Sequence, residues 1–340
     1  MPDSTPNQPA DDLASAIGRQ TNTRWSALLG EQATWVFLAA VVAAVALSLA
    51  TDTFASPQNI FNVSRNFAFV GIVALGMTVV IISGGIDLSV GSVVCLGAMV
   101  QAICMNAGYG FYSSAVAALT ASALVGFLNG ALIACLRIPS FVVTLGTLSI
   151  ARSAAMVLSD NRMIFEFGPD QALLFNLGGG STYGIAHPVI ALVTLGLMTS
   201  LMLRWTPWGT HVFAIGANER AAVLTGVKVP ALKISVYVFS SMIAGLTGIL
   251  EAGWLGGVTT NLGQSMELTV IAATVIGGAN LLGGSGTIFG AIVGAALIEI
   301  IRNSLILLGI STFWQGAFVG FFIVLAVAVD RLRALRELNL

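Results

Sequence analysis

Residues 67–100 have the sequence FAFVGIVALGMTVVIISGGIDLSVGSVVCLGAMV, in which two apolar runs flank the polar segment 83–89. Runs of this kind are typical of membrane helices, which need about 20 mostly apolar residues. Gly84 and Gly85 allow backbone conformations that a helix forbids, and Asp87 is costly at membrane depth. Non-helical backbone is tolerated there only when it is buried in protein or lines a water-filled cavity. The stretch therefore predicts two membrane helices separated by a buried break, in which Asp87 either caps the following helix or contacts a transported substrate.

The composition of the whole chain also indicates that most of it is surrounded by lipid. Of its 340 residues, 56% are hydrophobic and 9% are charged, whereas soluble domains carry about 25% charged residues. The mean hydropathy is +0.93 and the net charge is −1, so the chain has no basic surplus with which to bind nucleic acid. We expect an all-α membrane protein in contact with lipid.

Ten stretches are predicted as membrane spans. They lie near 33–50, 66–83, 90–107, 112–135, 140–158, 188–203, 234–256, 268–282, 287–308 and 313–330. The third, sixth and eighth are short for a complete span. On either side of a transmembrane domain at 33–333, we expect a disordered cytoplasmic tail at 1–32 and a short cytoplasmic tail at 334–340.

The orientation follows from the basic residues. With the N-terminus in the cytoplasm, ten of the 14 Lys and Arg residues lie on the predicted inner side. The outer side or its boundary holds Arg65, Arg152, Arg162 and Arg302. Because cytoplasmic loops carry the excess of positive charge, this distribution predicts that both termini are cytoplasmic. The longest predicted loops are then 159–187 outside and 204–233 inside.

The inner loop contains a short predicted helix. Residues 216–230 have the sequence GANERAAVLTGVKVP. Asn218 is a good N-cap, Glu219 complements the helix dipole, and Gly226 is a typical C-terminal stop. We expect about two helical turns, with Ala221 and Ala222 forming a flat side for a partner protein. A simple linker helix is the alternative.

A second glycine-rich segment, 277–285, matches the first at a shift of 193 residues. Five positions are identical, and Asp87 corresponds to Asn280; the identical pairs are Gly84/Gly277, Gly85/Gly278, Leu88/Leu281, Gly91/Gly284 and Ser92/Ser285. Internal repeats are common in transporters, whose pathway lies where the repeats meet. The match predicts two related halves, with pathway or gating residues drawn from both. The candidates for that role are Gly84, Gly85, Asp87, Ser89, Gly278, Asn280 and the intramembrane acid Glu251.

Motifs for chemistry are absent from the sequence. The two lysines, Lys228 and Lys233, follow no phosphate-binding loop, and His187 and His211 lie in different loops without metal-ligand spacing. We therefore expect no catalytic residue, cofactor or metal site. Among the other ionisable residues, Glu267 is predicted to begin a helix and Arg302 to lie near a helix end.

Several motifs together resemble the ribose-type sugar permeases of ATP-binding-cassette (ABC) importers. The motifs follow one another in the order found in that family, and the resemblance extends from about residue 50 to 333. The segments are 76–78 (GMT), 84–92 (GGIDLSVGS), 216–229, 267–268 (EL), 271–273 (IAA), 275–278 (VIGG) and 283–287 (GGSGT). One departure is Thr269, where members of that family often carry Asp after the Glu-Leu pair.

The resemblance implies a type II-like importer permease in the bacterial inner membrane. Its expected partners are an ABC ATPase subunit or tandem ATPase, a periplasmic substrate-binding protein and a second permease protomer. By similarity, Asn218, Glu219, Ala221, Ala222 and Gly226 belong to the helix that couples the ATPase to transport. The expected substrate is a monosaccharide or a similar small polar solute. The alternatives are a permease of the same superfamily for nucleosides or branched-chain amino acids, and an ion-coupled secondary transporter.

Overall fold

The computed structural model describes residues 32–311 together with 314, 316, 317, 320, 321 and 324. Within this part the named elements are all helices apart from one hairpin of two-residue strands. The elements in order are α3 (Gln32–Ala50), α4 (Pro57–Ile82), α5 (Val90–Asn106), α6 (Phe111–Cys135), α7 (Ser140–Leu158), α8 (Gln171–Gly179), β1 (Ser181–Thr182), β2 (Ile185–Ala186), α9 (His187–Trp205), α10 (Pro207–Leu224), α11 (Val229–Leu255), α12 (Met266–Ile276) and α13 (Ile288–Leu307).

Seven of the described helices are long and apolar enough to cross a membrane: α3, α4, α6, α7, α9, α11 and α13. The shorter apolar helices α5 and α12 occupy two further predicted spans. The predicted span at 313–330 and both predicted tails fall largely outside the described residues. The chain is therefore a multi-pass helical membrane protein.

Several predicted boundaries were wrong, for local reasons. α4 begins at Pro57 rather than near 66, because Ser56 caps it by accepting a hydrogen bond from the Asn59 N–H (3.3 Å). The sixth predicted span was expected to be short, but α9 has 19 residues. α12 stops at Ile276 instead of 282, because Gly278 adopts the left-handed conformation (φ +98°) that ends a helix.

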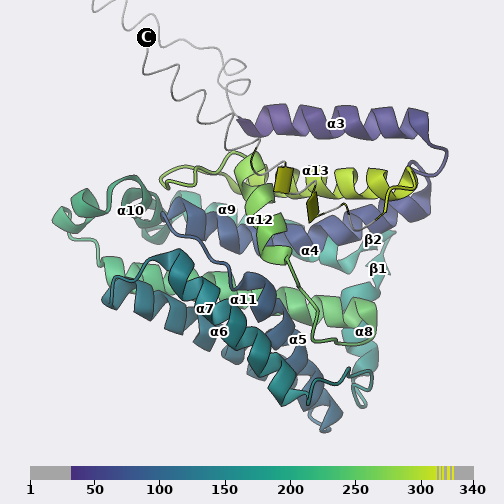
Figure 1. The fold of residues 1–340 in the computed structure, drawn as a ribbon, viewed down its shortest axis with the longest axis horizontal. Coiled ribbons are helices and arrows are strands. Elements are labelled where there is room, and N and C mark those ends of the chain that lie inside the picture. The colour runs from purple at the N-terminus through teal and green to yellow at the C-terminus, as the bar shows by residue number, and fades with distance from the viewer. Residues whose placement is uncertain (1–31, 312–313, 315, 318–319, 322–323, 325–340) are drawn as a thin grey trace, which may run out of the picture.

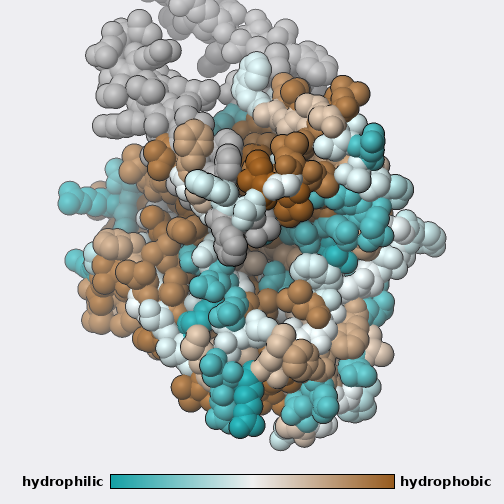
Figure 2. Space-filling model, turned by 45° about the vertical axis from the view of Figure 1, so that its right-hand side comes forward, coloured by the Kyte–Doolittle hydropathy of each residue, from teal (hydrophilic) through white to brown (hydrophobic). Residues whose placement is uncertain are grey.

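The helices pack around α11, which contacts α4, α5, α6 and α8. Figure 1 shows α10 at one end of the bundle, and α8 with the β1–β2 hairpin at the opposite end. The C-terminal half of α4 and nearly all of α5 are buried, whereas α3 and α7 are mostly exposed. Figure 2 shows hydrophobic side chains over much of one face, with hydrophilic side chains gathered in patches. Exposed apolar surface of this extent fits contact with lipid.

The predicted outer loop 159–187 is more structured than the sequence indicated. It contains α8, whose Gly178 lies close to the backbone of Leu250 and Trp254 in α11. His187 joins α8 to the hairpin, because its Nδ1 lies 2.6 Å from the Asn176 carbonyl oxygen and its Nε2 lies 2.8 Å from Thr182 Oγ1. Tertiary contacts with α11 therefore order this loop.

Glycines bring α6 and α11 into close contact. A Cβ atom at Gly130 would lie 2.5 Å from the Cα of Ile234, and one at Gly126 would lie 2.8 Å from the Cα of Val238. Both glycines, four residues apart and so on the same side of α6, thus face α11. Small residues let helix backbones approach closely where lipid provides no hydrophobic drive for association.

Replacing Gly130 with Leu is expected to lower the free energy of unfolding by about 1–3 kcal/mol or more, because the side chain cannot enter the α6–α11 contact without moving a helix. The measurement is thermal unfolding of the purified chain in detergent. Gly146→Leu on α7 is the matched control, since no atom lies within 4 Å of its Cβ position. Equal melting temperatures for the two variants would contradict this account of the packing.

Candidate functional site

Asp87 is fully buried within a network of hydrogen bonds. Its Oδ1 accepts from the Ser89 N–H (3.0 Å) and the Ser89 hydroxyl (2.6 Å), and its Oδ2 accepts from the Ser240 hydroxyl (3.2 Å). These partners offset the cost of burying a carboxylate. Of the two roles left open by the sequence, the contacts favour a structural one, because they attach the break after α4 to α11.

The same network extends across two more helices. Ser89 Oγ accepts from Asn129 Nδ2 of α6 (3.0 Å), and Asn129 Oδ1 accepts from the Thr147 hydroxyl of α7 (2.6 Å). Asn129 is completely buried. The chain Asp87–Ser89–Asn129–Thr147 therefore links the start of α5 to α6 and α7, in a region where water is not available to replace a lost partner.

The two glycine-rich segments end their helices in the same way. After α4, the Gly85 N–H donates to the Val80 carbonyl (3.0 Å); after α12, the Ala279 N–H donates to the Thr274 carbonyl (3.1 Å). The left-handed residues are Gly84 (φ +81°) and Gly278 (φ +98°). These helix ends correspond at a shift of 194 residues, one more than the sequence match.

The turns after these helix ends do follow the shift of 193. The Oδ1 of Asp87 accepts from the N–H two residues on, and the Oδ1 of Asn280 accepts from the Leu282 N–H (2.9 Å). The sequence match thus corresponds to two similar turns, displaced by one residue relative to the helices that precede them.

The two segments touch each other and α10. The Gly284 N–H donates to the Ile82 carbonyl (2.9 Å). A Cβ atom at Gly283 would lie 2.8 Å from the Gly216 carbonyl oxygen and 2.9 Å from the Cα of Gly84. We call this contact of Gly84, Gly216, Gly283 and Gly284 the glycine junction. It connects both breaks to the inner-loop helix predicted for docking.

α10 is longer than predicted and is kinked. Its first part begins at Pro207, and Asn218 interrupts it with an extended conformation (φ −159°, ψ 99°). As predicted, Asn218 caps the second part, because its Oδ1 accepts from the Ala221 N–H (3.0 Å), and Gly226 follows the end with φ +88°. The Glu219 carboxylate pairs with Lys233 at the start of α11 (2.7 Å).

The exposed side of this short helix agrees only in part with the predicted one, since Ala221 is exposed as predicted but Ala222 is not. Ala222 is buried (4% exposed) and therefore packs into the protein rather than facing a partner. Val223 and Leu224 are 55% and 88% exposed instead. We call the segment Glu219–Leu224 the tip of α10.

A cavity of 380 Å³ separates the tip from the break after α4. Gly84, Gly85 and Tyr237 line it together with both members of the Glu219–Lys233 pair. The Tyr237 hydroxyl donates to the Ile86 carbonyl (3.4 Å). The first break and the tip thus share a space at the same end of the bundle.

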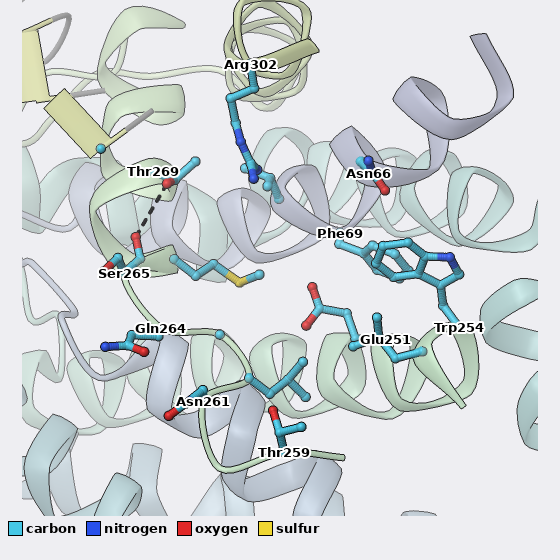
Figure 3. A pocket seen from close by; sticks show the side chains of 16 residues that line it. Asn66, Phe69, Glu251, Trp254, Thr259, Asn261, Gln264, Ser265, Thr269 and Arg302 are labelled. Atoms are coloured by element: carbon cyan, nitrogen blue, oxygen red, sulfur yellow. Dashed lines mark hydrogen bonds between the residues drawn. The ribbon is translucent and has the colours of Figure 1, made fainter. Parts of the chain in front are cut away.

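A larger cavity of 630 Å³ lies between α4, α11, α12, α13 and the connection 256–265. Glu251 points into it from α11, and Arg302 enters from α13 on the opposite wall (Figure 3). The other polar lining residues are Asn66, Thr259, Asn261, Gln264, Ser265 and Thr269. Its size is within the range of small-molecule sites, about 300–1,000 Å³.

The candidates predicted for the pathway therefore separate. Glu251 alone lines the larger cavity, whereas Gly84 and Gly85 line the smaller one. Asp87 and Ser89 belong to the buried network, and Gly278 and Asn280 shape the second break. Sequence reasoning missed Asn261 and Gln264, because exposed polar residues in a loop carry no periodic signal. It placed Arg302 near a helix end, but the side chain faces the cavity.

Arg152 positions the connection that walls this cavity. One guanidinium nitrogen donates to the carbonyls of Thr260 (2.8 Å) and Leu262 (2.6 Å), and the other donates to that of Gly91 (3.4 Å). The arginine therefore satisfies backbone acceptors that lipid could not. No group of three or more His, Cys, Asp and Glu residues suited to a metal ion occurs among the described residues.

A bundle of apolar helices with buried polar networks, two glycine-rich breaks between helices and a polar internal cavity fits a membrane permease. The sequence profile of a family described as "Branched-chain amino acid transport system / permease component" matches residues 59–327. The chain belongs to this family.

Individual relatives match along most of their length. The chain is 34% identical to a ribose import permease protein of Bacillus subtilis (strain 168), over 87% of this chain and 91% of the relative. It is 33% identical to an L-arabinose ABC transporter permease protein of Azospirillum brasilense, over 96% and 94%. It is also 34% identical to an autoinducer 2 import system permease protein of Photorhabdus laumondii, over 86% and 88%. No solved structure matches the chain with significant similarity.

Replacing Asp87 with Ala is expected to lower the free energy of unfolding by about 1–3 kcal/mol, because the buried hydroxyls of Ser89 and Ser240 lose their acceptor. Asp87→Asn, which keeps an acceptor oxygen, is expected to lose less. Thermal unfolding in detergent measures both variants beside Asp52→Ala, a change at an exposed acid. A melting temperature for Asp87→Ala equal to that of the control would refute the anchoring role.

Proposed function

We propose that the chain is the membrane-spanning permease subunit of an ATP-driven importer for a monosaccharide or a similar small polar solute. The names of the relatives support the substrate class, since they include permeases for ribose and L-arabinose. These relatives are transport permeases, so the chain moves its substrate without chemical change. ATP hydrolysis is assigned to a separate ATPase subunit or tandem ATPase.

The observation that carries this proposal is the position of the α10 tip. It presents Val223 and Leu224 to the exterior at the end of the bundle, beyond the apolar spans. Exposed apolar side chains at such a place fit a protein partner. Eight residues or fewer separate them from Gly216, which touches both breaks at the glycine junction. A force applied to the tip by an ATPase thus has a short route into both halves of the protein.

The remaining features complete a type II-like importer. We assign ten spans, both termini and the α10 tip to the cytoplasmic side, and the α8–β1–β2 end to the side where a periplasmic binding protein delivers the solute. A second permease protomer, here a copy of the same chain, completes the pathway. Residues 33–333 form the transmembrane domain in this arrangement, between cytoplasmic tails at 1–32 and 334–340.

Two alternatives have weaker support. The first alternative is a permease of the same superfamily for branched-chain amino acids, which the description of the family names, or for nucleosides. The ribose and L-arabinose permeases among the relatives favour sugars instead. An ion-coupled secondary transporter leaves the exposed tip of α10 without a role. Pathway residues other than Glu251 contribute through the breaks, where Gly84, Gly85 and Gly278 permit the backbone to change direction and Asp87, Ser89 and Asn280 brace it.

Substituting Asp for Val223 and Leu224 together is expected to reduce binding of the ATPase, because two charges replace apolar contact area at the tip. Co-purification of the ATPase with the tagged permease measures the effect, and we expect at least about a tenfold loss of affinity. Tyr183→Asp is the control, since Tyr183 is fully exposed at the opposite end of the molecule. Undiminished binding by the double variant would exclude the tip as the docking surface.

Glu219→Lys is expected to reduce uptake, because the Lys233 ammonium then faces a like charge and the attachment of the tip to α11 is weakened. Proteoliposomes containing the permease, the ATPase and the binding protein are assayed for uptake of labelled ribose with and without ATP. The double variant Glu219→Lys/Lys233→Glu, which restores the pair with its charges exchanged, is the control. Uptake driven by an ion gradient without the ATPase, and unchanged in Glu219→Lys, would replace this proposal with a secondary transporter.

A further inference from the structure

We propose that the 630 Å³ cavity between α4, α11, α12 and α13 is a transient binding site for one neutral polyhydroxylated solute, with the Glu251 carboxyl group as its principal hydrogen-bonding partner. The inference rests on the proposed function and extends it. Selection of the substrate then occurs in the permease itself as well as in the binding protein that delivers it.

Glu251 has no hydrogen-bonding partner among the described residues, and the nearest opposite charge is that of Arg302 across the cavity. It is 7% exposed and projects from the buried side of α11 into the cavity (Figure 3). No hydrogen bond joins its carboxyl group to another residue in the part of the chain that the structure describes. A buried carboxyl group without such bonds is costly, so a ligand or water that supplies hydroxyl groups gains a strong interaction there.

The charge around the cavity disfavours an anionic ligand. Arg302 is the cation that lines the described walls, and its guanidinium already bonds to the Glu299 carboxylate (3.2 Å). Glu299 is itself buried (5% exposed). The arginine charge is thus balanced by Glu299, and a carboxylate ligand would enter beside both Glu299 and Glu251. A zwitterionic amino acid is less favourable here than a neutral solute.

The other walls suit hydroxyl groups. Asn261 and Gln264 on the connection and Thr269 on α12 line the cavity with groups that both donate and accept. Trp254, stacked on Phe69 with ring centroids 5.5 Å apart, supplies an apolar wall. A sugar presents hydroxyl groups around its edge and C–H groups on its faces, so this combination of walls satisfies both.

The site is predicted to select sugars over branched-chain amino acids, because an apolar ligand would leave polar groups of the cavity without hydrogen bonds. A site that offers polar partners rejects a ligand lacking them, because the buried groups are then left without hydrogen bonds. The α-ammonium group of leucine or valine can donate to Glu251, but the apolar side chain leaves the amides of Asn261 and Gln264 without partners, whereas the hydroxyl groups of a sugar can bond to all three. We therefore expect ribose and arabinose to bind, and branched-chain amino acids to be excluded.

Protection from thiol labelling tests binding without requiring transport. In the full chain the three native cysteines are replaced (Cys95→Ser, Cys104→Ser and Cys135→Ser). Gln264→Cys then introduces the single thiol that is labelled, at the wall of the cavity. In detergent, D-ribose is expected to slow labelling about twofold at the concentration that half-saturates the cavity. Glu251→Leu should raise that concentration about tenfold or more, with Glu251→Gln between the two. A reporter at Glu166→Cys, on the outer loop, should label at the same rate with and without sugar.

Uptake by the complete importer, measured in parallel, separates the two proposals. ATP-dependent ribose uptake without any protection at Gln264→Cys would overturn the binding site and leave the proposed function intact. Protection by leucine or valine in place of sugars would also overturn it, as would protection by sodium ions alone. Protection by ribose that is lost in Glu251→Leu, together with a raised KM for uptake in that variant, would establish the site. Failure of every sugar in the uptake assay would refute the proposed function instead.

Discussion

The hydrogen bond from the Gly284 N–H to the Ile82 carbonyl is the contact on which the rest of the arrangement depends. The Ile82 carbonyl is the last of α4 and has no partner in its own helix, and the Gly284 N–H belongs to the break before α13, so each group satisfies the other. The two breaks satisfy each other only because glycines at 84, 216, 283 and 284 let three backbone segments meet without side chains between them. Any rearrangement of one break therefore changes the surroundings of the other.

The polar groups inside the protein serve two physical purposes. Asp87, Ser89, Asn129 and Thr147 form a closed network whose members bond to one another, and such networks fix one arrangement of helices. Glu251 instead faces a cavity in which the described protein provides it with no hydrogen bond. The contrast favours a bracing role for the first group and is the basis for the proposed contact between Glu251 and a solute.

The position of the junction explains how distant events are linked. The tip of α10 is held to α11 by the Glu219–Lys233 pair and reaches the junction through Gly216. The larger cavity is walled by α12, which ends at the second break, and by α4, which ends at the first. In the proposed function, movement at the tip would reach the cavity through the ends of these two helices, both of which are followed by glycine-rich breaks.

The membrane environment, the approximate position of most described spans, the breaks, and the caps at Asn218 and Gly226 could all be predicted from the sequence, because they depend on local hydrophobicity and backbone preference. The sequence also indicated the similarity of the turns at Asp87 and Asn280. It could not show that Ala222 is buried, that α8 packs on α11, that Arg302 faces Glu251 across a cavity, or that the helix ends correspond at a shift of 194 residues. Those facts depend on helix rotation and on contacts between residues far apart in the chain. In a membrane both sides of a helix are apolar, so hydrophobic periodicity does not reveal which side faces the protein.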